Sequence, residues 1–287
     1  AKGVLMRAQQ LSEDDAFALL RTASMQANLR VGEVSRSLIE AAQAAEAINR
    51  AGQLRMLSQR HVKALALGAE ARGRVEDTLA ETAQRVQRHL DWLARLNLPP
   101  AEAALLAATG AAWTALQQTA VPAVGRSTPA VAAQLTEADR LAEQLLERAD
   151  ALTGALEAGS GRRHLQVVNV SGRQRMLAQR LAKQALLAGL LAGPPAAAHA
   201  QAAAQTVHEF ESALSTLEQA PLATEPIRAA LAQARGQWQR LLDGLRRSDG
   251  PDAAAGLAAL ARESEALVAS FDQLTSLYEH SMQVLLG

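Results

Sequence analysis

The chain has 287 residues, of which 49% are hydrophobic and only 2% aromatic, and its 29 basic residues balance 29 acidic ones. Much of the hydrophobic content is alanine and leucine, whereas strands favour β-branched and aromatic residues, so the composition predicts helices packed on helices. A net charge of zero gives no electrostatic argument for nucleic acid or an anionic membrane as a partner. The absence of cysteine excludes disulfides and thiolate chemistry.

The first half of the chain predicts four helices. From Ser12 to Arg72 there is no proline, and apolar residues recur every three or four positions, which indicates one long helix capped by Ser12. Prolines and a loop at 121–129 then separate three further helices. We expect these at about 74–96, 100–119 and 128–157.

The second half predicts four more helices after a joint at Gly159-Ser160-Gly161. They are expected at about 162–192, 197–219, 225–247 and 252–285. Trp113 and Trp238 fall in the third helix of each half, and we expect both to be packing anchors in the core. The fold class predicted is all-α, with two tandem antiparallel four-helix bundles at residues 12–158 and 159–287.

A polar sequence block occurs twice, as NRAGQLRMLSQRHVK at residues 49–63 and as NVSGRQRMLAQRLAK at residues 169–183. Eight residues of the first block are identical to the residues 120 positions later in the second block. They are Asn49, Gly52, Arg55, Met56, Leu57, Gln59, Arg60 and Lys63. Core packing accounts for the methionine and leucine positions. It gives no reason to keep a glycine, two arginines, a glutamine and a lysine in register, so the block indicates a site.

Gly52, Arg55 and Gln59 lie within an arc of about 60° on a helix, and the second block repeats this arc. A guanidinium presents a planar fork of donors that suits a small planar oxyanion. If the two faces meet across a pseudo-twofold axis, they form a pocket with two arginines and no carboxylate, and the glycines let another helix approach closely. The predicted ligand-binding residues are Gly52, Arg55, Gln59, Gly172, Arg175 and Gln179.

The strings INRAGQLRMLSQR and VNVSGRQRMLAQRLAK resemble the signature of the PilJ-type sensor domain, the N-terminal domain of type IV pili methyl-accepting chemotaxis transducers. They are also similar to the periplasmic box of nitrate and nitrite sensor kinases of the NarX and NarQ type. The resemblance implies a four-helix bundle outside the inner membrane that binds nitrate or a related anion between two copies of its first helix. By position, Arg55 and Arg175 would clamp the anion, and Gly52 and Gly172 would allow backbone approach.

The resemblance also bears on assembly, location and partners. Two copies in one chain either pair with each other, as an intramolecular pseudo-dimer, or form a homodimer with another molecule. The chain opens AKG without methionine, which we interpret as a mature or excised product, and we expect a periplasmic location. No kinase, methylation-helix or DNA-binding segment is recognised, so we expect signalling through a separate membrane-bound signalling or transport protein.

Two functional classes remain open. We find no nucleophile elbow, glycine-rich phosphate loop, paired catalytic acids or histidine spacing for a metal, and we therefore expect no catalytic residues, no metal, no cofactor and no enzyme activity. The first class is a sensor of nitrate or nitrite. The alternative is a structural or adaptor protein in which the block is a helix-packing seam and binds no small molecule. The two classes predict different surroundings for Arg55 and Arg175. In a sensor they converge on a buried anion-sized space, and in a packing seam they pair with acids such as Glu46 or Glu70.

Overall fold

The computed structural model describes residues 1–287 except for residues 10, 27–28, 69–71, 120–127, 161–165, 221–223, 249 and 286–287. The described part contains ten α-helices and no strand, so the all-α prediction is confirmed. The helices are α1 (Lys2–Gln9), α2 (Glu13–Gln26), α3 (Val31–Leu67), α4 (Arg72–Ala94), α5 (Pro100–Gln117), α6 (Pro129–Gly159), α7 (Gln166–Leu190), α8 (Pro194–Glu218), α9 (Glu225–Ser248) and α10 (Ala253–Leu285).

The prediction of one helix from Ser12 to Arg72 is wrong, because the chain turns between α2 and α3. Ser12 does cap α2, since its hydroxyl accepts from the Asp15 amide at 3.1 Å. At the far end, the hydroxyl of Ser24 donates to the carbonyl of Leu29, which links the last turns of α2 to the residues before α3. The Glu33 carboxylate then accepts from the Arg30 amide at 2.8 Å and starts α3. Spacing of apolar residues hid this break because both helices keep the same period.

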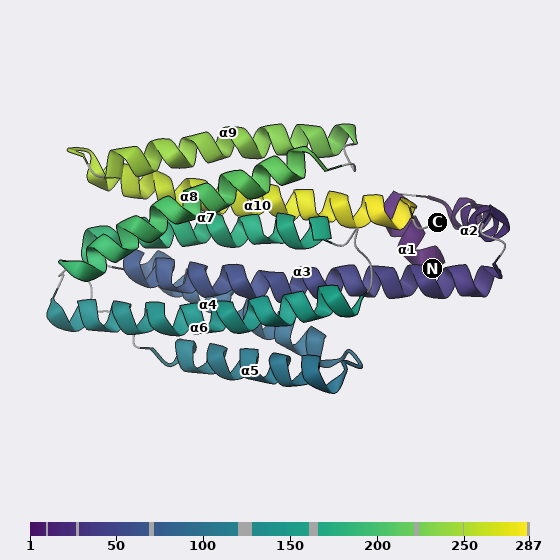
Figure 1. Ribbon diagram of the computed structural model, residues 1–287, viewed down its shortest axis with the longest axis horizontal. Coiled ribbons are helices and arrows are strands. Elements are labelled where there is room, and N and C mark those ends of the chain that lie inside the picture. Colours follow the sequence, from purple (N-terminus) through teal and green to yellow (C-terminus); the bar gives the residue numbers. More distant parts are fainter. Residues whose placement is uncertain are drawn as a thin grey trace.

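The first two helices form an apolar cluster of their own with the start of α3. The buried members are Leu5, Ala16, Leu20, Ala23, Val34 and Leu38. Figure 1 shows α1 and α2 at one end of the molecule, beside the beginning of α3 and the end of α10. This end of the molecule lies apart from the main helical bundle. The predicted first bundle, residues 12–158, included α2, which belongs to this end.

The other eight helices form the main bundle, in which six helices pack around a central pair, α3 and α7. α6 packs on α3 and α10 packs on α7, while α4 and α5 complete one side and α8 and α9 the other (Figure 1). α3 and α7 run in the same direction, and α6 and α10 run opposite to them. Each half therefore supplies four helices, but the division into domains 12–158 and 159–287 stays a prediction because the two halves share one core.

That core is a single apolar cluster, with members such as Leu57 of α3 and Leu181 of α7. Trp238 is fully buried and stacks on Phe210 with ring centroids 3.7 Å apart, and Trp113 is 3% exposed and meets the His61 ring edge-on at 5.4 Å. The prediction that both tryptophans anchor the packing is confirmed.

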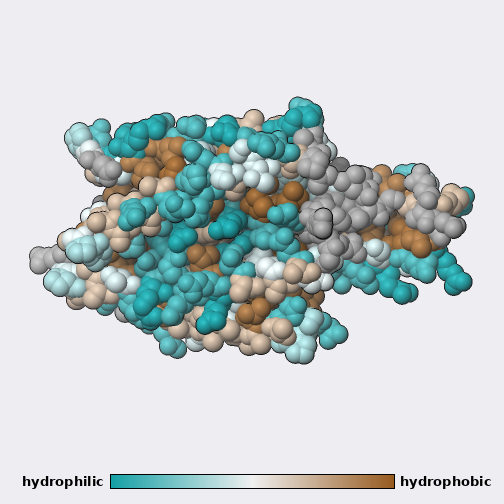
Figure 2. Space-filling model, viewed as in Figure 1, coloured by the Kyte–Doolittle hydropathy of each residue, from teal (hydrophilic) through white to brown (hydrophobic). Residues whose placement is uncertain are grey.

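The outer surface of the bundle in Figure 2 is mostly hydrophilic, as expected when each helix turns its apolar side toward the core. In the view of Figure 2, hydrophilic residues cover much of the bundle, with smaller hydrophobic areas between them. Within the described residues, no helix combines the length and the apolar character that a membrane span requires.

Candidate functional site

The repeated block lies in the centre of the molecule. Every residue of α3 from Ala51 to Ala66 is buried, so this part of the helix has no face toward solvent. In the matching part of α7, Gly172, Arg175 and Gln179 are buried too, whereas Arg173 is exposed and Arg180 is half-buried. Buried polar side chains are costly unless they are paired, so each polar residue of the block needs partners inside the protein.

Arg55 is held by two other helices. Its side chain is 2% exposed, and its Nη1 donates to Asp150 Oδ1 of α6 at 2.7 Å. Its Nη2 donates to Asn169 Oδ1 of α7, also at 2.7 Å. The first half thus supplies the acid that faces this arginine, and the second half supplies the amide.

Arg175 repeats this arrangement from the other half. Its side chain is 1% exposed, its Nη1 donates to Asp272 Oδ1 of α10 at 2.5 Å, and its Nη2 donates to Asn49 Oδ1 of α3 at 2.7 Å. The two arginines are therefore related by a pseudo-twofold axis between α3 and α7, and each depends on an asparagine of the opposite half.

The asparagines extend both networks by one more acid. Asn169 Nδ2 donates to Glu157 Oε2 at 2.5 Å, and Asn49 hydrogen-bonds to Glu279. Each asparagine amide accepts from an arginine and donates to a glutamate. This explains why both blocks have an asparagine six positions before the arginine.

The two glycines make room for guanidinium groups. A Cβ added to Gly52 would lie 3.1 Å from Nη2 of Arg55 and 3.9 Å from Nη2 of Arg175, and one added to Gly172 would lie 3.0 Å and 3.7 Å from the same atoms in reverse order. The glycines were predicted to admit another helix. The structure shows instead that the nearest neighbour of each is the arginine three positions later, with the arginine of the other half next to it.

The two glutamines of the predicted site lie elsewhere. Gln59 donates to Ser58 Oγ at 3.1 Å and hydrogen-bonds to Glu143, while Gln179 donates to the Ser264 carbonyl at 3.3 Å and to Glu265 Oε1 at 3.2 Å. The structure thus brings together Gly52, Arg55, Gly172 and Arg175. Gln59 and Gln179 belong instead to a neighbouring layer of the interface.

That layer also contains the lysines of the block, and its ion pairs cross between the halves. Lys63 Nζ lies 2.6 Å from Glu265 Oε1, and Lys183 Nζ lies 2.6 Å from Glu143 Oε1. Arg60 and Arg180 pair with the same two glutamates. Arg60 lies 3.1 Å from Glu265, and Arg180 lies 3.1 Å from Glu143.

The acids are the residues that the sequence analysis missed. They stand at seven-residue intervals on two helices, as Glu143, Asp150 and Glu157 on α6 and as Glu265, Asp272 and Glu279 on α10. The prediction of an arginine pocket without carboxylates is therefore wrong. A signal was present, because DALTGALE at 150–157 and DQLTSLYE at 272–279 are a second repeat, offset by 122 residues.

The acids that we had named as possible partners do not fill this role. Glu46 pairs with Arg50 at 2.7 Å, and Glu70 lies outside the described residues. Both acids are close to Arg55 in sequence, whereas its partner in the structure, Asp150, is 95 residues away.

Burial shifts the pKa values of several groups in these layers. It lowers the pKa of Arg55, although Asp150 opposes the effect. It also raises the pKa of Glu279 to about 7 against the opposing charge of Arg175. Burial would raise the pKa of Glu265 too, but Lys63 and Arg60 outweigh it and hold that pKa at about 2. Burial therefore favours the neutral form of Glu279, whereas the neighbouring cations favour the charged form of Glu265.

Comparison with known families gives two matches. The model described as type IV pili methyl-accepting chemotaxis transducer N-term matches residues 38–157 and again residues 159–262. A model of the ANTAR domain matches residues 1–39, the segment that contains α1, α2 and the start of α3. The sequence analysis did not single out this segment. No curated protein and no solved structure matches the chain.

Proposed function

Because the chain belongs to the family of type IV pili methyl-accepting chemotaxis transducer N-terminal domains, with two tandem copies, we propose that it binds a small oxyanion, nitrate or nitrite, between Arg55 and Arg175. Membership in this family makes the chain a sensory signalling module. The family is one of sensors rather than catalysts, which supports a non-catalytic role for this chain.

The convergence of the two guanidinium groups carries the proposal. Nη2 of Arg55 and Nη2 of Arg175 both lie within 3.9 Å of the Cβ position of Gly52, so two like charges meet inside the protein. In addition, Nε of Arg55 is buried and has no hydrogen-bond partner among the described residues. A planar oxyanion would accept from donors of both forks and offset their mutual repulsion.

The ion pairs of the site bear on the mechanism. Asp150 and Asp272 already offset the repulsion between the two arginines when no anion is bound. An anion at the glycines competes with these carboxylates and with Asn49 and Asn169 for the arginine donors. Binding would loosen the hold of α3 and α7 on α6 and α10, and the shift is limited by the anion's differential affinity for the two arrangements.

The same geometry favours pairing within one chain. Each half contributes one arginine and the asparagine that supports the other arginine, so one chain supplies the complete set of partners. A homodimer is then not needed to build the site. A separate membrane-bound partner and a periplasmic location stay predictions that rest on the family resemblance.

Calorimetric titration with nitrate and nitrite, with sulfate and chloride as controls, tests the proposal. We expect one anion per chain, with binding lost in both Arg55→Lys and Arg175→Lys, because lysine keeps the charge but not the fork. Arg140→Lys is the matched control, since Arg140 is exposed and pairs with Glu137 on its own helix. Loss of binding in only one of the first two variants would contradict a shared site.

A second candidate function has its own support. The buried Arg55, Lys63, Arg175 and Lys183 are all paired with acids of the protein, as a helix-packing seam requires. If no nitrate or nitrite binds at millimolar concentration while Arg55→Lys and Arg175→Lys lower the stability, the block is a seam. The sensor would then have to recognise its ligand elsewhere.

A further inference from the structure

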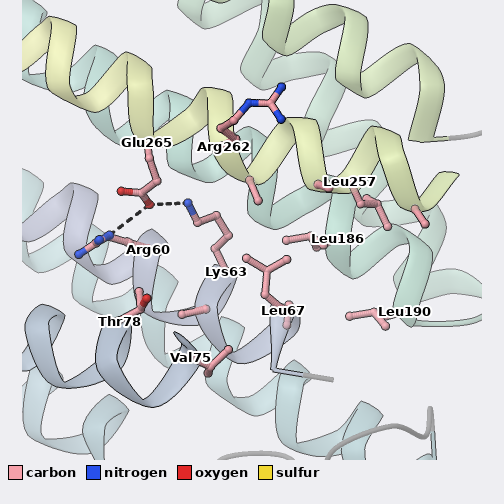
Figure 3. A pocket seen from close by; sticks show the side chains of 15 residues that line it. Arg60, Lys63, Leu67, Val75, Thr78, Leu186, Leu190, Leu257, Arg262 and Glu265 are labelled. Carbon is pink, nitrogen blue, oxygen red and sulfur yellow. Dashed lines mark hydrogen bonds and ion pairs between the residues drawn. The ribbon is translucent and has the colours of Figure 1, made fainter. Parts of the chain in front are cut away.

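A pocket lies beyond the lysine layer, between the ends of α3 and α7 and the beginnings of α4 and α10 (Figure 3). Its volume is about 530 Å³, within the usual range of roughly 300–1,000 Å³ for small-molecule sites. It is separate from the arginine pair, since Lys63 is eight positions from Arg55, or about 12 Å along a helix.

The walls of this pocket are aliphatic. Leucines from three helices line it, namely Leu67 of α3, Leu186 and Leu190 of α7 and Leu257 of α10, and Val75 of α4 lies opposite. The described lining residues include no aromatic side chain. Such a surface favours a flexible hydrocarbon chain over a flat ring system.

One end of the pocket is cationic. Figure 3 shows Arg60 and Lys63 directed toward Glu265, with Arg262 above them. Arg60 and Lys63 share the Glu265 carboxylate, at 3.1 Å and 2.6 Å. Arg60 also pairs with Glu81 at 3.1 Å, and Arg262 pairs with Glu263, so Glu265 is the one carboxylate that pairs with Lys63 among the described residues. Lys63 itself is 2% exposed, so its charge is neutralised by protein groups rather than by bulk water.

The surroundings of Lys183 in the second block show which carboxylate is missing beside Lys63. There Lys183 lies 2.5 Å from Asp139 and 2.6 Å from Glu143, so two carboxylates face one buried ammonium. Under the 122-residue offset, Glu143 corresponds to Glu265, but Asp139 corresponds to Ala261. Ala261 lines the pocket, so the second carboxylate of the Lys183 layer is replaced by open space beside Lys63.

We propose that this pocket binds an aliphatic monocarboxylate, with its carboxylate beside Lys63 in the place that Asp139 takes beside Lys183. The hydrocarbon chain lies along Leu186, Leu190 and Leu257. Arg262 pairs with Glu263 at 2.9 Å, is 70% exposed and stands at the rim, so it can turn to cover the bound headgroup. The inference does not depend on anion binding at Arg55 and Arg175.

The test is calorimetric titration of the whole chain with octanoate, compared with 1-octanol, which has the same chain length and no charge. We expect octanoate to bind saturably, one per chain, and at least about tenfold more tightly than octanol, because only the carboxylate can form a charge-assisted hydrogen bond with Lys63. Octanol binding as tightly as octanoate would overturn the assignment, and so would the absence of octanoate binding.

Two variants of nearly equal size sharpen the result. Ala261→Asp supplies the missing carboxylate and should weaken octanoate binding by at least about tenfold relative to Ala261→Asn, which fills the same space without charge. Circular dichroism melting confirms that both variants fold. Equal affinities in the two variants would refute the proposed placement. Arg55→Lys should leave octanoate binding unchanged, which separates this site from the oxyanion site.

Discussion

Arg55 of one half donates to the side-chain oxygen of Asn169 in the other half at 2.7 Å, across the boundary between the two repeats. The inverse pair, Arg175 and Asn49, has the same length. These reciprocal bonds tie each arginine to the repeat that does not contain it. The site is therefore a property of the paired halves, and neither half holds its arginine in this position alone.

This reciprocity predicts energetic coupling between Arg55 and Asn169. In a double-mutant cycle of Arg55→Ala and Asn169→Ala, measured by urea unfolding, we expect a coupling free energy of about 1–3 kcal/mol, because the removal of either partner already breaks the bond. The pair Arg55 and Arg140 is the control, since Arg140 lies on the surface and pairs with Glu137. Additive effects in the first cycle would contradict a structural bond between the halves.

The glycines predict an effect on binding that is distinct from stability. Gly52→Ala and Gly172→Ala place a Cβ 3.1 Å and 3.0 Å from the guanidinium of the same helix, so each arginine must shift. We expect a loss of nitrate affinity of at least about tenfold, whereas the helix itself gains up to about 1 kcal/mol from the alanine. Gly110→Ala in α5 is the control, because its Cβ meets nothing within 4 Å and nitrate binding should be unchanged.

Competition between aspartate and ligand predicts a gain of function. If Asp150 and Asp272 hold the arginines in the unbound state, Asp150→Asn and Asp272→Asn should each raise nitrate affinity by about three- to tenfold, because the arginine loses a charged competitor. The same substitutions should lower stability, which thermal melting without nitrate measures. A fall in affinity in both variants would instead make the aspartates part of the binding arrangement.

Glu279 predicts a dependence of stability on pH. Burial raises its pKa from 4.5 to about 7, so the folded state holds this proton more tightly than the unfolded state. The contribution to the free energy of unfolding is fully present below pH 4.5 and is lost as the pH rises to about 7. Glu279→Gln, which keeps a neutral side chain, should lack this loss.

The histidines make the comparison with Glu279→Gln necessary. Burial lowers the pKa values of His61 and His89 from 6.5 to about 4, so their contribution has the opposite sign and rises with pH between these values. The difference between wild type and Glu279→Gln cancels the histidine effect. Urea unfolding at several pH values between 4.5 and 7.5 would show it, and a constant difference would contradict the raised pKa.

The sequence by itself determined the all-α class, most of the helix positions and the importance of the repeated block. Composition and three- to four-residue spacing are local properties, and they identify a helix wherever it packs. The same spacing could not show the turn between Ser24 and Arg30, because it continues unchanged from α2 into α3. The spacing also could not show that Gln59 and Gln179 lie outside the arginine site. Residues on one face of a helix can still contact different partners, because they lie at different heights along the helix axis.

Only the tertiary structure decided which residues meet Arg55 and Arg175. Asp150 and Asn169 are 95 and 114 residues from Arg55, and helix periodicity carries no information over such separations. The second repeat on α6 and α10 was visible in the sequence, but its meaning depends on these helices running opposite to α3 and α7 and facing them. Buried charges must find partners, and packing determines which acids are near enough to serve.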